Sequence, residues 1–455
     1  MAGSGVVLAT GNQTVSRYLA PGGYLCTVYS VRLPDLPPDF RARALEWASG
    51  FPFCAYFEPN NVAYPHGSFQ RRLAVRGSLA PSPGTLAELE QWLGQASEAP
   101  RCGLLTYDLK NELEVLHSRH PDGLEWPTLH FFEPEIWLEW QTDTLEIYTI
   151  SSASASPTDI LAQILATRPL TQPVSAPLSF EARMPKAEYL AAVENIREDI
   201  LNGEVYELNL CQEFYAENVV LDPVAVFLRL QEVSPTPFAG FYRWHDRYLL
   251  CASPERFLRR QGSTLLSQPI KGTIRRGATP ETDEQQRLTL LHDEKERAEN
   301  LMIVDLVRND LARVAETGTV HVPELFGLYP FRHVWQMIST VQATAQPGLG
   351  LVDALRATFP MGSMTGAPKI RAMQLIEHYE RARRGLYSGS IGYVLPNGDF
   401  DFNVVIRSLQ YRQNTGYLSF QVGSAITYDS VPEREYEECL LKAQAILDVL
   451  GVQQL

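Results

Sequence analysis

Residues 205–217, with the sequence VYELNLCQEFYAE, decide the fold class of this chain. Apolar and aromatic residues that favour extended strands alternate there with polar ones. A segment with apolar residues at helical spacing precedes it and ends near Gly203, where a C-terminal cap is expected. The spaced residues are Tyr189, Ala192, Val193, Ile196 and Ile200. A helix followed by a strand is therefore predicted at this point.

The rest of the C-terminal part mixes strands and helices without a regular alternation or an internal repeat. Helices are predicted around residues 283–313, 364–381 and 433–450. Because strand-like segments follow one another with only short polar turns, such as 261–263, antiparallel pairing is expected. The fold class predicted is α+β. The strand-like segments are 238–244, 247–253, 255–260, 388–395, 402–411 and 417–427.

The chain divides into two unequal parts. Residues 151–182 are rich in Ser, Ala and Pro, which is typical of a linker with one short helix at most. Residues 1–150 carry little concentrated chemistry and are interpreted as a variable scaffold region. The chemistry is therefore expected in residues 183–455.

Composition excludes several classes of protein. The chain has 455 residues, 45% of them hydrophobic, and a formal net charge of −14, which argues against binding to nucleic acid. Neither a signal peptide nor a run long enough to span a membrane is recognised, so a cytoplasmic location is expected. The six cysteines lie far apart and are interpreted as reduced, mostly buried thiols.

The C-terminal helix after Pro432 carries charges on an unexpected face. On a helical wheel, Glu435, Glu438 and Lys442 form a stripe opposite the ordinary solvent face. Apolar residues border this stripe, which indicates a buried or cleft-facing side. The bordering residues are Cys439, Ala445, Ile446 and Val449.

A second helix, through residues 294–311, shows the same anomaly at Glu299, which lies among apolar residues on the wheel. Burying an unpaired carboxylate costs several kcal/mol, so inward glutamates on two helices require a cation. Oxygen ligands without His or Cys suit Mg²⁺, which we therefore predict as a cofactor. The alternative is a set of interhelix ion pairs with Lys or Arg.

Seven segments resemble the chorismate-utilising enzymes and follow one another in the order of that family. The resemblance covers about residues 183–450 and is much looser before residue 180. It implies two large, mostly antiparallel β-sheets packed as a sandwich with helices outside. The segments are SPERF (253–257), PIKGT (269–273), AENLMIVDLVRNDLARV (298–314), GSMTGAPK (362–369), RRGLYSGSIGY (383–393), VIRSL (405–409) and DSVPERE (429–435).

Within that family, the residue after PI in PIKGT distinguishes two branches. Anthranilate synthases typically have Ala there and aminodeoxychorismate synthases have Lys, and this chain has Lys271. The resemblance implies that the lysine amine attacks C2 of chorismate and expels the 4-hydroxyl, after which ammonia adds at C4. Because the amine must be neutral, we expect its pKa to fall from near 10.4 towards about 7.5, a shift equivalent to roughly 4 kcal/mol.

The resemblance also assigns an acid and a metal site. Glu255 matches the general acid, for which a raised pKa is expected, although an ion pair with Arg256 is the alternative. Glu299 and Glu438 match direct Mg²⁺ ligands. Glu296 and Glu435 match residues that hold metal-bound water.

Other positions match the family's substrate-binding residues. Tyr387, Arg407 and Lys442 are expected to bind chorismate, with Arg407 as a plain surface charge being the alternative. Further hydrogen bonds are expected from the backbone of Gly423 and Ser424 and from Thr273.

Two positions depart from the family pattern. Glu207 stands where isochorismate and salicylate synthases have a catalytic Lys and aminating relatives often have Gln. The absence of that Lys argues against water as the nucleophile. Gln336 stands where many members have His, so any role of that histidine must be filled in another way.

The ammonia source is expected to lie outside the chain. A glutaminase needs a nucleophilic Cys in a strand–turn–helix elbow, and no cysteine here has that glycine-rich context. A separate glutamine amidotransferase subunit is therefore the predicted partner, with ammonia in solution as the alternative source. Two other functions remain open: that of the large subunit of anthranilate synthase, which Lys271 disfavours, and that of a catalytically silent scaffold.

Overall fold

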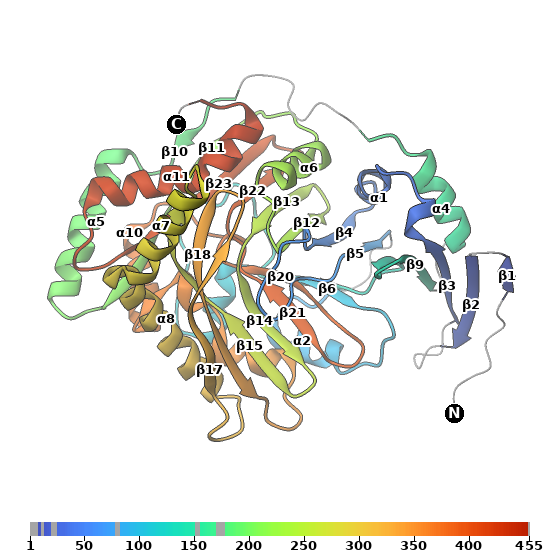
Figure 1. Ribbon diagram of the computed structural model, residues 1–455, viewed down its shortest axis with the longest axis horizontal. Helices are drawn as coiled ribbons and strands as arrows, with labels where there is room; N and C mark the ends of the chain where they lie inside the picture. Colours follow the sequence, from blue (N-terminus) through green and yellow to red (C-terminus); the bar gives the residue numbers. More distant parts are fainter. Residues whose placement is uncertain are drawn as a thin grey trace.

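The computed structural model describes residues 8–10, 13–19, 25–77, 82–150, 155–169 and 178–453. Within these residues the chain forms two antiparallel sheets, called sheet A and sheet B, and several helices (Figure 1). The start of the chain, where a signal peptide would lie, is largely outside the described residues, as are 151–154 and 170–177 of the linker.

Sheet A has 14 strands. In addition to its main path, the short β19 (Gly366–Ala367) pairs with β11. The order along the main path is β1 (Leu8–Thr10), β2 (Gln13–Leu19), β3 (Leu25–Arg32), β9 (Thr144–Ile150), β8 (Ile136–Trp140), β5 (Arg72–Arg76), β4 (Phe53–Glu58), β12 (Phe238–Trp244), β13 (Arg247–Ser253), β22 (Ser408–Arg412), β23 (Tyr417–Ile426), β11 (Glu207–Ala216) and β10 (Glu181–Ala182).

Sheet B has nine strands. In addition to its main path, β17 (His321–Pro330) pairs with β18. The order along the main path is β16 (Ile270–Arg275), β18 (Val334–Thr344), β15 (Thr264–Gln268), β14 (Arg256–Gln261), β21 (Phe400–Asn403), β20 (Ser390–Val394), β6 (Arg101–Leu105) and β7 (Leu129–Phe132).

The helices pack on the outer faces of the two sheets. The α-helices of the described residues are α1 (Phe40–Ala48), α2 (Leu86–Leu93), α3 (Lys110–Leu113), α4 (Pro157–Ala166), α5 (Lys186–Leu201), α6 (Pro223–Val233), α7 (Pro280–His292), α8 (Glu294–Ala312), α9 (Leu351–Thr358), α10 (Lys369–Tyr379) and α11 (Pro432–Leu450). Short 3-10 turns occur at η1 (Leu33–Asp35), η2 (Tyr107–Leu109) and η3 (Gly362–Met364). None of these helices has both the length and the apolar character needed to span a membrane.

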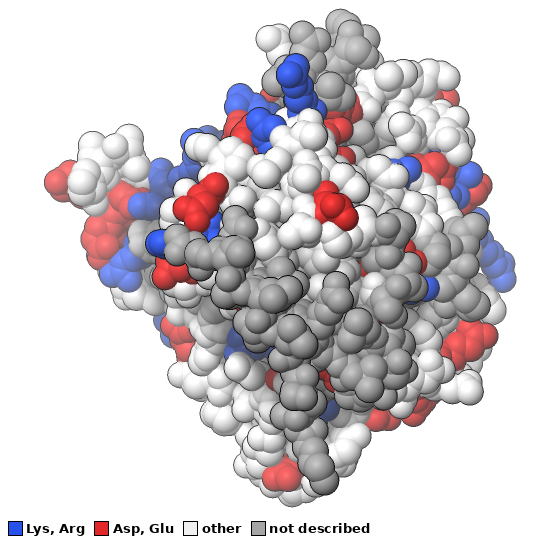
Figure 2. Space-filling view, turned by 90° about the vertical axis from the view of Figure 1, so that its right-hand side faces the viewer, with Lys and Arg blue, Asp and Glu red and all other residues white. Residues whose placement is uncertain are grey.

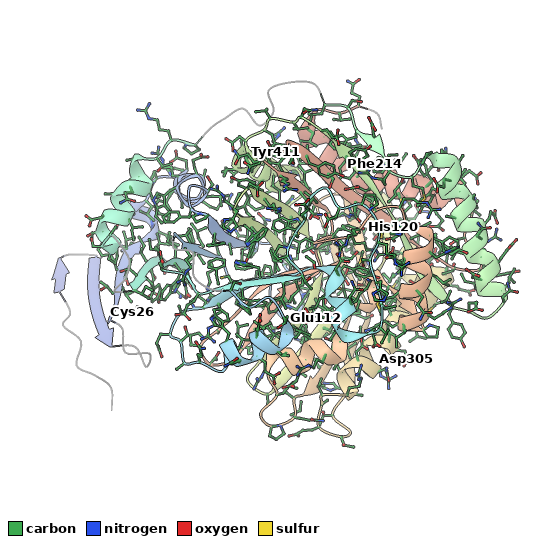
Figure 3. The ribbon with its side chains drawn as sticks, turned by 180° about the vertical axis from the view of Figure 1, so that it is seen from behind. Cys26, Glu112, His120, Phe214, Asp305 and Tyr411 are labelled. Carbon is green, nitrogen blue, oxygen red and sulfur yellow. The ribbon has the colours of Figure 1, made fainter. Side chains whose placement is uncertain are left out.

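Three apolar layers hold the sheets and helices together. Between the sheets, Tyr242 and Leu249 of sheet A pack in one cluster with Leu104 and Ile391 of sheet B. Phe214 and Tyr411, labelled in Figure 3, belong to the layer between sheet A and helices that include α5, α6 and α11. A third layer lies between sheet B and α8. The predicted α+β sandwich with outer helices is confirmed.

Two helices differ from their predicted bounds. The helix expected over 283–313 is two helices, α7 and α8, because Asp293 ends the first and its side chain caps the second by accepting from the backbone N–H of Glu296 at 3.0 Å. The helix expected from 364 begins only at Lys369, since η3 and β19 occupy the residues before it. The short helix allowed for in the linker is α4.

Strands from both parts of the chain share both sheets. In sheet A, β4 pairs with β12, and in sheet B, β6 pairs with β20. The division at residues 151–182 stays a prediction about sequence character.

One end of the molecule, which carries β3 and α4 at the right of Figure 1, faces the viewer in Figure 2. Among the residues coloured there, basic and acidic side chains are interspersed (Figure 2). The predicted absence of a nucleic-acid partner and the cytoplasmic location stay predictions.

A buried ion pair in sheet B supports a prediction about stability. Arg256 is fully buried and donates to both carboxylate oxygens of Asp401, at 2.9 and 3.1 Å. Asp401→Ala leaves a buried guanidinium without its counter-charge, so we expect a loss of about 3–5 kcal/mol in the free energy of unfolding. Urea denaturation of the variant and of the wild type measures this difference in the free energy of unfolding.

The matched control is Asp305→Ala at the exposed pair of Asp305 with Arg308, where the Asp305 side chain is 74% exposed (Figure 3). It should cost less than about 1 kcal/mol. Equal losses in the two variants would contradict the role given to the buried pair.

Candidate active site

Lys271 lies in a bulge at the edge of sheet B. Ile270 pairs with Ile338 and Thr273 with Gln336, so β16 has one more residue than β18 between these two pairs. Bulges re-aim side chains, and this one contains Lys271 and Gly272. Gly272 has a φ of +102°, and an added Cβ would lie 3.0 Å from the Cβ of Met337. The glycine of PIKGT therefore allows the turn that presents Lys271.

The amine of Lys271 contacts a carboxylate. Its Nζ lies 2.7 Å from Oε1 of Glu207, and the two side chains are 11% and 2% exposed. Burial lowers the pKa of Lys271, but the charges of Glu207, Glu299 and Glu438 outweigh burial, so the net shift is upward. The structure thus differs from the expected lowered pKa, because the amine is surrounded by carboxylates.

Glu255 lies between β13 and β14 and is 4% exposed. Its backbone N–H donates to Oγ of Ser253 at 3.2 Å, and its Oε1 accepts from Oγ of Ser363 at 2.7 Å. Burial raises the pKa of Glu255 to about 7, against the opposing effects of the Ser363 hydrogen bond and the Lys271 charge. The expected raised pKa is therefore present, and its cause is desolvation.

The alternative considered for Glu255, an ion pair with Arg256, is not formed. The guanidinium of Arg256 instead contacts Asp401, the side-chain oxygen of Gln268 and the backbone oxygen of Gly67. Adjacent residues in an extended chain point to opposite sides, which separates the two side chains. Glu255 is consequently free of a fixed cationic partner among the described residues.

The four carboxylates predicted for the metal surround one lysine. Glu296 and Glu299 come from α8, and Glu435 and Glu438 come from α11, with both helices in the left half of Figure 1. Burial lowers the pKa of Lys295 and all four carboxylates raise it, with a net upward shift. Nζ of Lys295 lies 3.7 Å from Glu299 and 3.8 Å from Glu435.

One interhelix ion pair of the kind considered as an alternative is thus present, between Lys295 of α8 and Glu435 of α11, but it is long at 3.8 Å, and the pair with Glu299 lies within α8. The Lys295 side chain is 46% exposed. Ion pairs with exposed partners contribute little to stability. Lys295 therefore neutralises only part of the acidic cluster.

The carboxylates also repel one another. Burial raises the pKa of Glu296 to about 7, and the charges of Glu299 and Glu438 add to the effect. Burial likewise raises the pKa of Glu299, although Lys271 opposes it. Within the described residues, no three acidic, His or Cys side chains converge into a ready metal cage. An all-oxygen set of this kind fits Mg²⁺, which takes one or two carboxylates and keeps several waters.

Lys442 faces the same cluster from α11. Its Nζ lies 2.7 Å from Oε1 of Glu438 and donates to the backbone oxygen of Gly423 at 2.8 Å. A Cβ at Gly423 would lie 2.5 Å from Sγ of Cys211, so only glycine allows β11 and β23 to pack this closely there. The side-chain hydroxyl of Ser424 shares a hydrogen bond with the hydroxyl of Tyr189 at 3.0 Å.

Arg407 and Tyr387 are two further predicted substrate-binding side chains, and Tyr387 acts electrostatically on Arg407. Arg407 is half-buried and has a φ of 52°, a left-handed conformation that costs about 1–3 kcal/mol in a non-glycine residue. No acidic side chain of the described residues forms an ion pair with its guanidinium. Burial lowers the pKa of Arg407, while Tyr387 and Glu438 oppose that effect. The guanidinium is therefore available to an anion, unlike a plain strand-surface charge.

Thr273 is exposed and pairs in register with Gln336. Gln336 is 4% exposed, and within the described residues its buried Oε1 has no hydrogen-bond partner. The polar group that replaces the family's histidine is thus an unused acceptor beside β16.

Sequence reasoning missed the residues that support the site. Ser363 of η3 holds Glu255, and its backbone oxygen accepts from Nδ2 of Asn209 at 2.9 Å. Arg384, which is paired with Glu380 in the core, donates to the backbone oxygens of Met364 and Asn209. Both GSMTGAPK and RRGLYSGSIGY were recognisable, but a motif match alone gave these residues no role.

Comparison with known proteins finds a matching family and several relatives. Residues 70–448 match the family described as chorismate binding enzyme. Aminodeoxychorismate synthase component 1 of Bacillus subtilis is 35% identical over 365 residues, covering 77% of each chain. Anthranilate synthase component 1 of Thermus thermophilus is 37% identical, covering 76% of each.

Plant relatives are longer. The probable chloroplastic aminodeoxychorismate synthase of Oryza sativa subsp. japonica is 44% identical over 269 residues, which is 58% of this chain. The chain covers 30% of that relative and 39% of the aminodeoxychorismate synthase of Arabidopsis thaliana.

Solved structures agree on the fold. Anthranilate synthase component I from Streptococcus pneumoniae superposes with a TM-score of 0.71 at 30% identity, covering 88% of this chain and 90% of that one. The menaquinone-specific isochorismate synthase of Escherichia coli gives 0.76 at 18% identity, covering 93% and 94%. Since the match spans most of the chain, this protein belongs to the family of chorismate binding enzymes.

Proposed function

We propose that the chain aminates chorismate at C4 with ammonia to give 4-amino-4-deoxychorismate, the reaction of aminodeoxychorismate synthases. The observation that carries this proposal is the pairing of a nucleophile with an acid. Lys271 lies near enough to Glu255 for its charge to lower the pKa of that carboxyl group. An amine and a carboxyl group with a pKa of about 7 are the groups that a two-step displacement needs.

The two steps balance in atoms and charge. The neutral amine of Lys271 forms a bond to C2 of the ring, both conjugated double bonds of the ring shift by one position, and the C4–O bond breaks. Glu255 gives its proton to the departing hydroxyl, which leaves as water. Ammonia then bonds to C4, both double bonds shift back, and the C2–N bond to Lys271 breaks, which frees the lysine amine.

Chorismate has two carboxylates, and the site offers cations for them. Arg407 has no acidic ion-pair partner within the described residues, and Lys442 lies beside the Gly423 backbone. Tyr387 and Thr273 supply further polar groups, together with the backbone at Ser424. Binding the ring by these groups would orient C2 towards Lys271.

We further propose Mg²⁺ as the cofactor. Glu299 and Glu438 would bind it directly, with Glu296 and Glu435 holding its water ligands. The bound ion supplies positive charge that neutralises this acidic cluster and attracts one substrate carboxylate. The support is the mutual repulsion of the carboxylates, since burial and neighbouring charge raise the pKa of Glu296.

Ammonia would come from a separate glutamine amidotransferase subunit in the cytoplasm. Burial raises the pKa of the thiols of Cys102, Cys211 and Cys251 to about 12, which makes them poor nucleophiles. The names of the bacterial relatives as component 1 support a second component. Ammonium salt should replace that subunit in the laboratory.

A second candidate function is that of anthranilate synthase component 1. It is favoured by the Thermus thermophilus relative, whose identity of 37% is close to that of the Bacillus subtilis relative. Lys271 argues against it, because anthranilate synthases typically have Ala at that position. The product distinguishes the two functions.

The first prediction concerns that product. The purified chain with chorismate, ammonium salt and Mg²⁺ should form a nonaromatic 4-amino compound, identified by mass and ultraviolet spectra, and EDTA should abolish its formation. Anthranilate as the product would establish the second candidate. No turnover, even after addition of an amidotransferase subunit, would favour a silent scaffold.

The second prediction concerns the nucleophile. Lys271→Ala should reduce formation of the 4-amino product to below about 1% of wild type, because no side chain remains to attack C2. The matched control is Lys186→Ala on α5, whose lysine lies over the ring of Tyr436. It should retain activity within about twofold. Unchanged product formation by Lys271→Ala would exclude the covalent route.

The third prediction concerns pH. Because the pKa of Glu255 is raised to about 7, its proton-donating form is present below that pH and is lost above it. At saturating Mg²⁺, kcat/KM should therefore fall as pH rises through about 7. In Glu255→Gln the residual activity should lack this decline, and a decline with an unchanged midpoint would assign it to another group.

A further inference from the structure

Glu207 is fixed at the start of β11 and is 1% exposed. It pairs in register with Ala367 of β19, and the next residue, Leu208, pairs with Ile426 of β23. Gly366 has a φ of +152°, and a Cβ there would lie 2.1 Å from the backbone oxygen of Glu207. The backbone that carries this carboxylate is thus held between two strands and cannot shift freely.

The two carboxylate oxygens of Glu207 have different surroundings. Its Oε1 contacts Nζ of Lys271 at 2.7 Å, while its buried Oε2 has no hydrogen-bond partner within the described residues. A buried carboxylate oxygen without a hydrogen-bond partner is costly. The carboxylate therefore has one oxygen in contact with the amine and a second oxygen with unused acceptor capacity within the described residues.

Other charged groups face Lys271 but none replaces Glu207. Glu299 from α8 and Glu438 from α11 raise the pKa of Lys271, and Glu255 responds to its charge from the β13–β14 connection. Among the described residues, only Glu207 contacts the amine nitrogen. Asn300 contacts the backbone oxygen of Lys271, at 3.1 Å, and not its side chain.

We propose that Glu207 is the catalytic base that takes a proton from Lys271. This inference rests on the proposed function. The N–H bond of the ammonium breaks, its proton bonds to Glu207, and the freed electron pair of Nζ forms the bond to C2. One proton moves between two residues, so no further reactant is required. When the lysine is expelled by ammonia, the same carboxyl group can return the proton to it.

The opposite role for Glu207 makes an opposite prediction. A carboxylate that only holds Lys271 in its charged form would slow the attack, and its removal would increase the rate. A carboxylate that accepts the proton would increase the rate, and its removal would slow it. Both roles predict that the free amine becomes easier to modify when Glu207 loses its charge.

The test uses Glu207→Gln, which keeps the size and a hydrogen-bond acceptor but cannot take the proton. With ammonium and saturating Mg²⁺, we expect kcat to fall about 100-fold and KM for chorismate to stay within about threefold. Without chorismate, acetylation of Lys271 by acetic anhydride, followed by peptide mass spectrometry, should reach its midpoint about one pH unit lower than in wild type. Faster acetylation of Lys271 in the absence of chorismate, combined with a lower kcat, is the result expected when a catalytic base is lost.

The matched control is Glu213→Gln on the same face of β11. Glu213 is 4% exposed, contacts Arg183 and Tyr417, and makes no contact with Lys271. Its kcat should stay within about threefold of wild type. A loss as large as that of Glu207→Gln would mean that disturbance of β11 causes the effect, which would overturn the proposal.

A chemical rescue provides a second measurement. Glu207→Ala removes the carboxylate and leaves space for a small acid. Formate should therefore increase the rate of this variant at least about tenfold, and chloride at equal ionic strength should not. If formate does not increase the rate and Glu207→Gln keeps the wild-type kcat, the role of Glu207 as a base is overturned, while the proposed function stands. A wild-type chain that does not aminate chorismate would instead overturn the proposed function on which the inference rests.

Discussion

The confinement of acidic side chains around one buried amine is the constraint on which the site depends. Lys271 lies where the edge of sheet B meets β11 of sheet A, and carboxylates approach it from β11, α8 and α11. Charges this close in a poorly solvated space must be balanced, because removal of one partner leaves an uncompensated charge. The site is therefore a set of opposing charges, in which Lys295 contacts Glu435 and Lys442 contacts Glu438.

Part of this arrangement could be predicted from helix geometry alone. Glu299 appeared among apolar residues on a wheel, and its 8% exposure confirms the inward orientation. Glu435, assigned to an inward stripe in the same way, is 3% exposed, whereas the side chain of Glu438 is 46% exposed and lies at the open rim. A wheel reports the direction of a side chain, but not how far the helix end extends into solvent.

Other features depend on contacts between segments far apart in sequence. The contact of Lys271 with Glu207 requires both sheets, and the position of Lys295 between two helices requires their packing. The break at Asp293 has the residue type of a cap, but the pattern of residues 283–313 continues through it. The left-handed conformation of Arg407 and the bulge at Gly272 are set by the strands around them, so composition and spacing carry no signal for either.

Sheet A joins segments that the ribosome makes at very different times. β4 is complete early, but its partner β12 follows only after the linker, as the pairing of Glu58 with Ala239 shows. In sheet B the separation is greater still, because Leu105 pairs with Ser390. Non-local pairings of this kind slow folding and leave strand edges exposed in the meantime. The nascent chain must therefore carry β6 unpaired on its β20 side until β20 has been synthesised, and this period is when it most needs protection from aggregation.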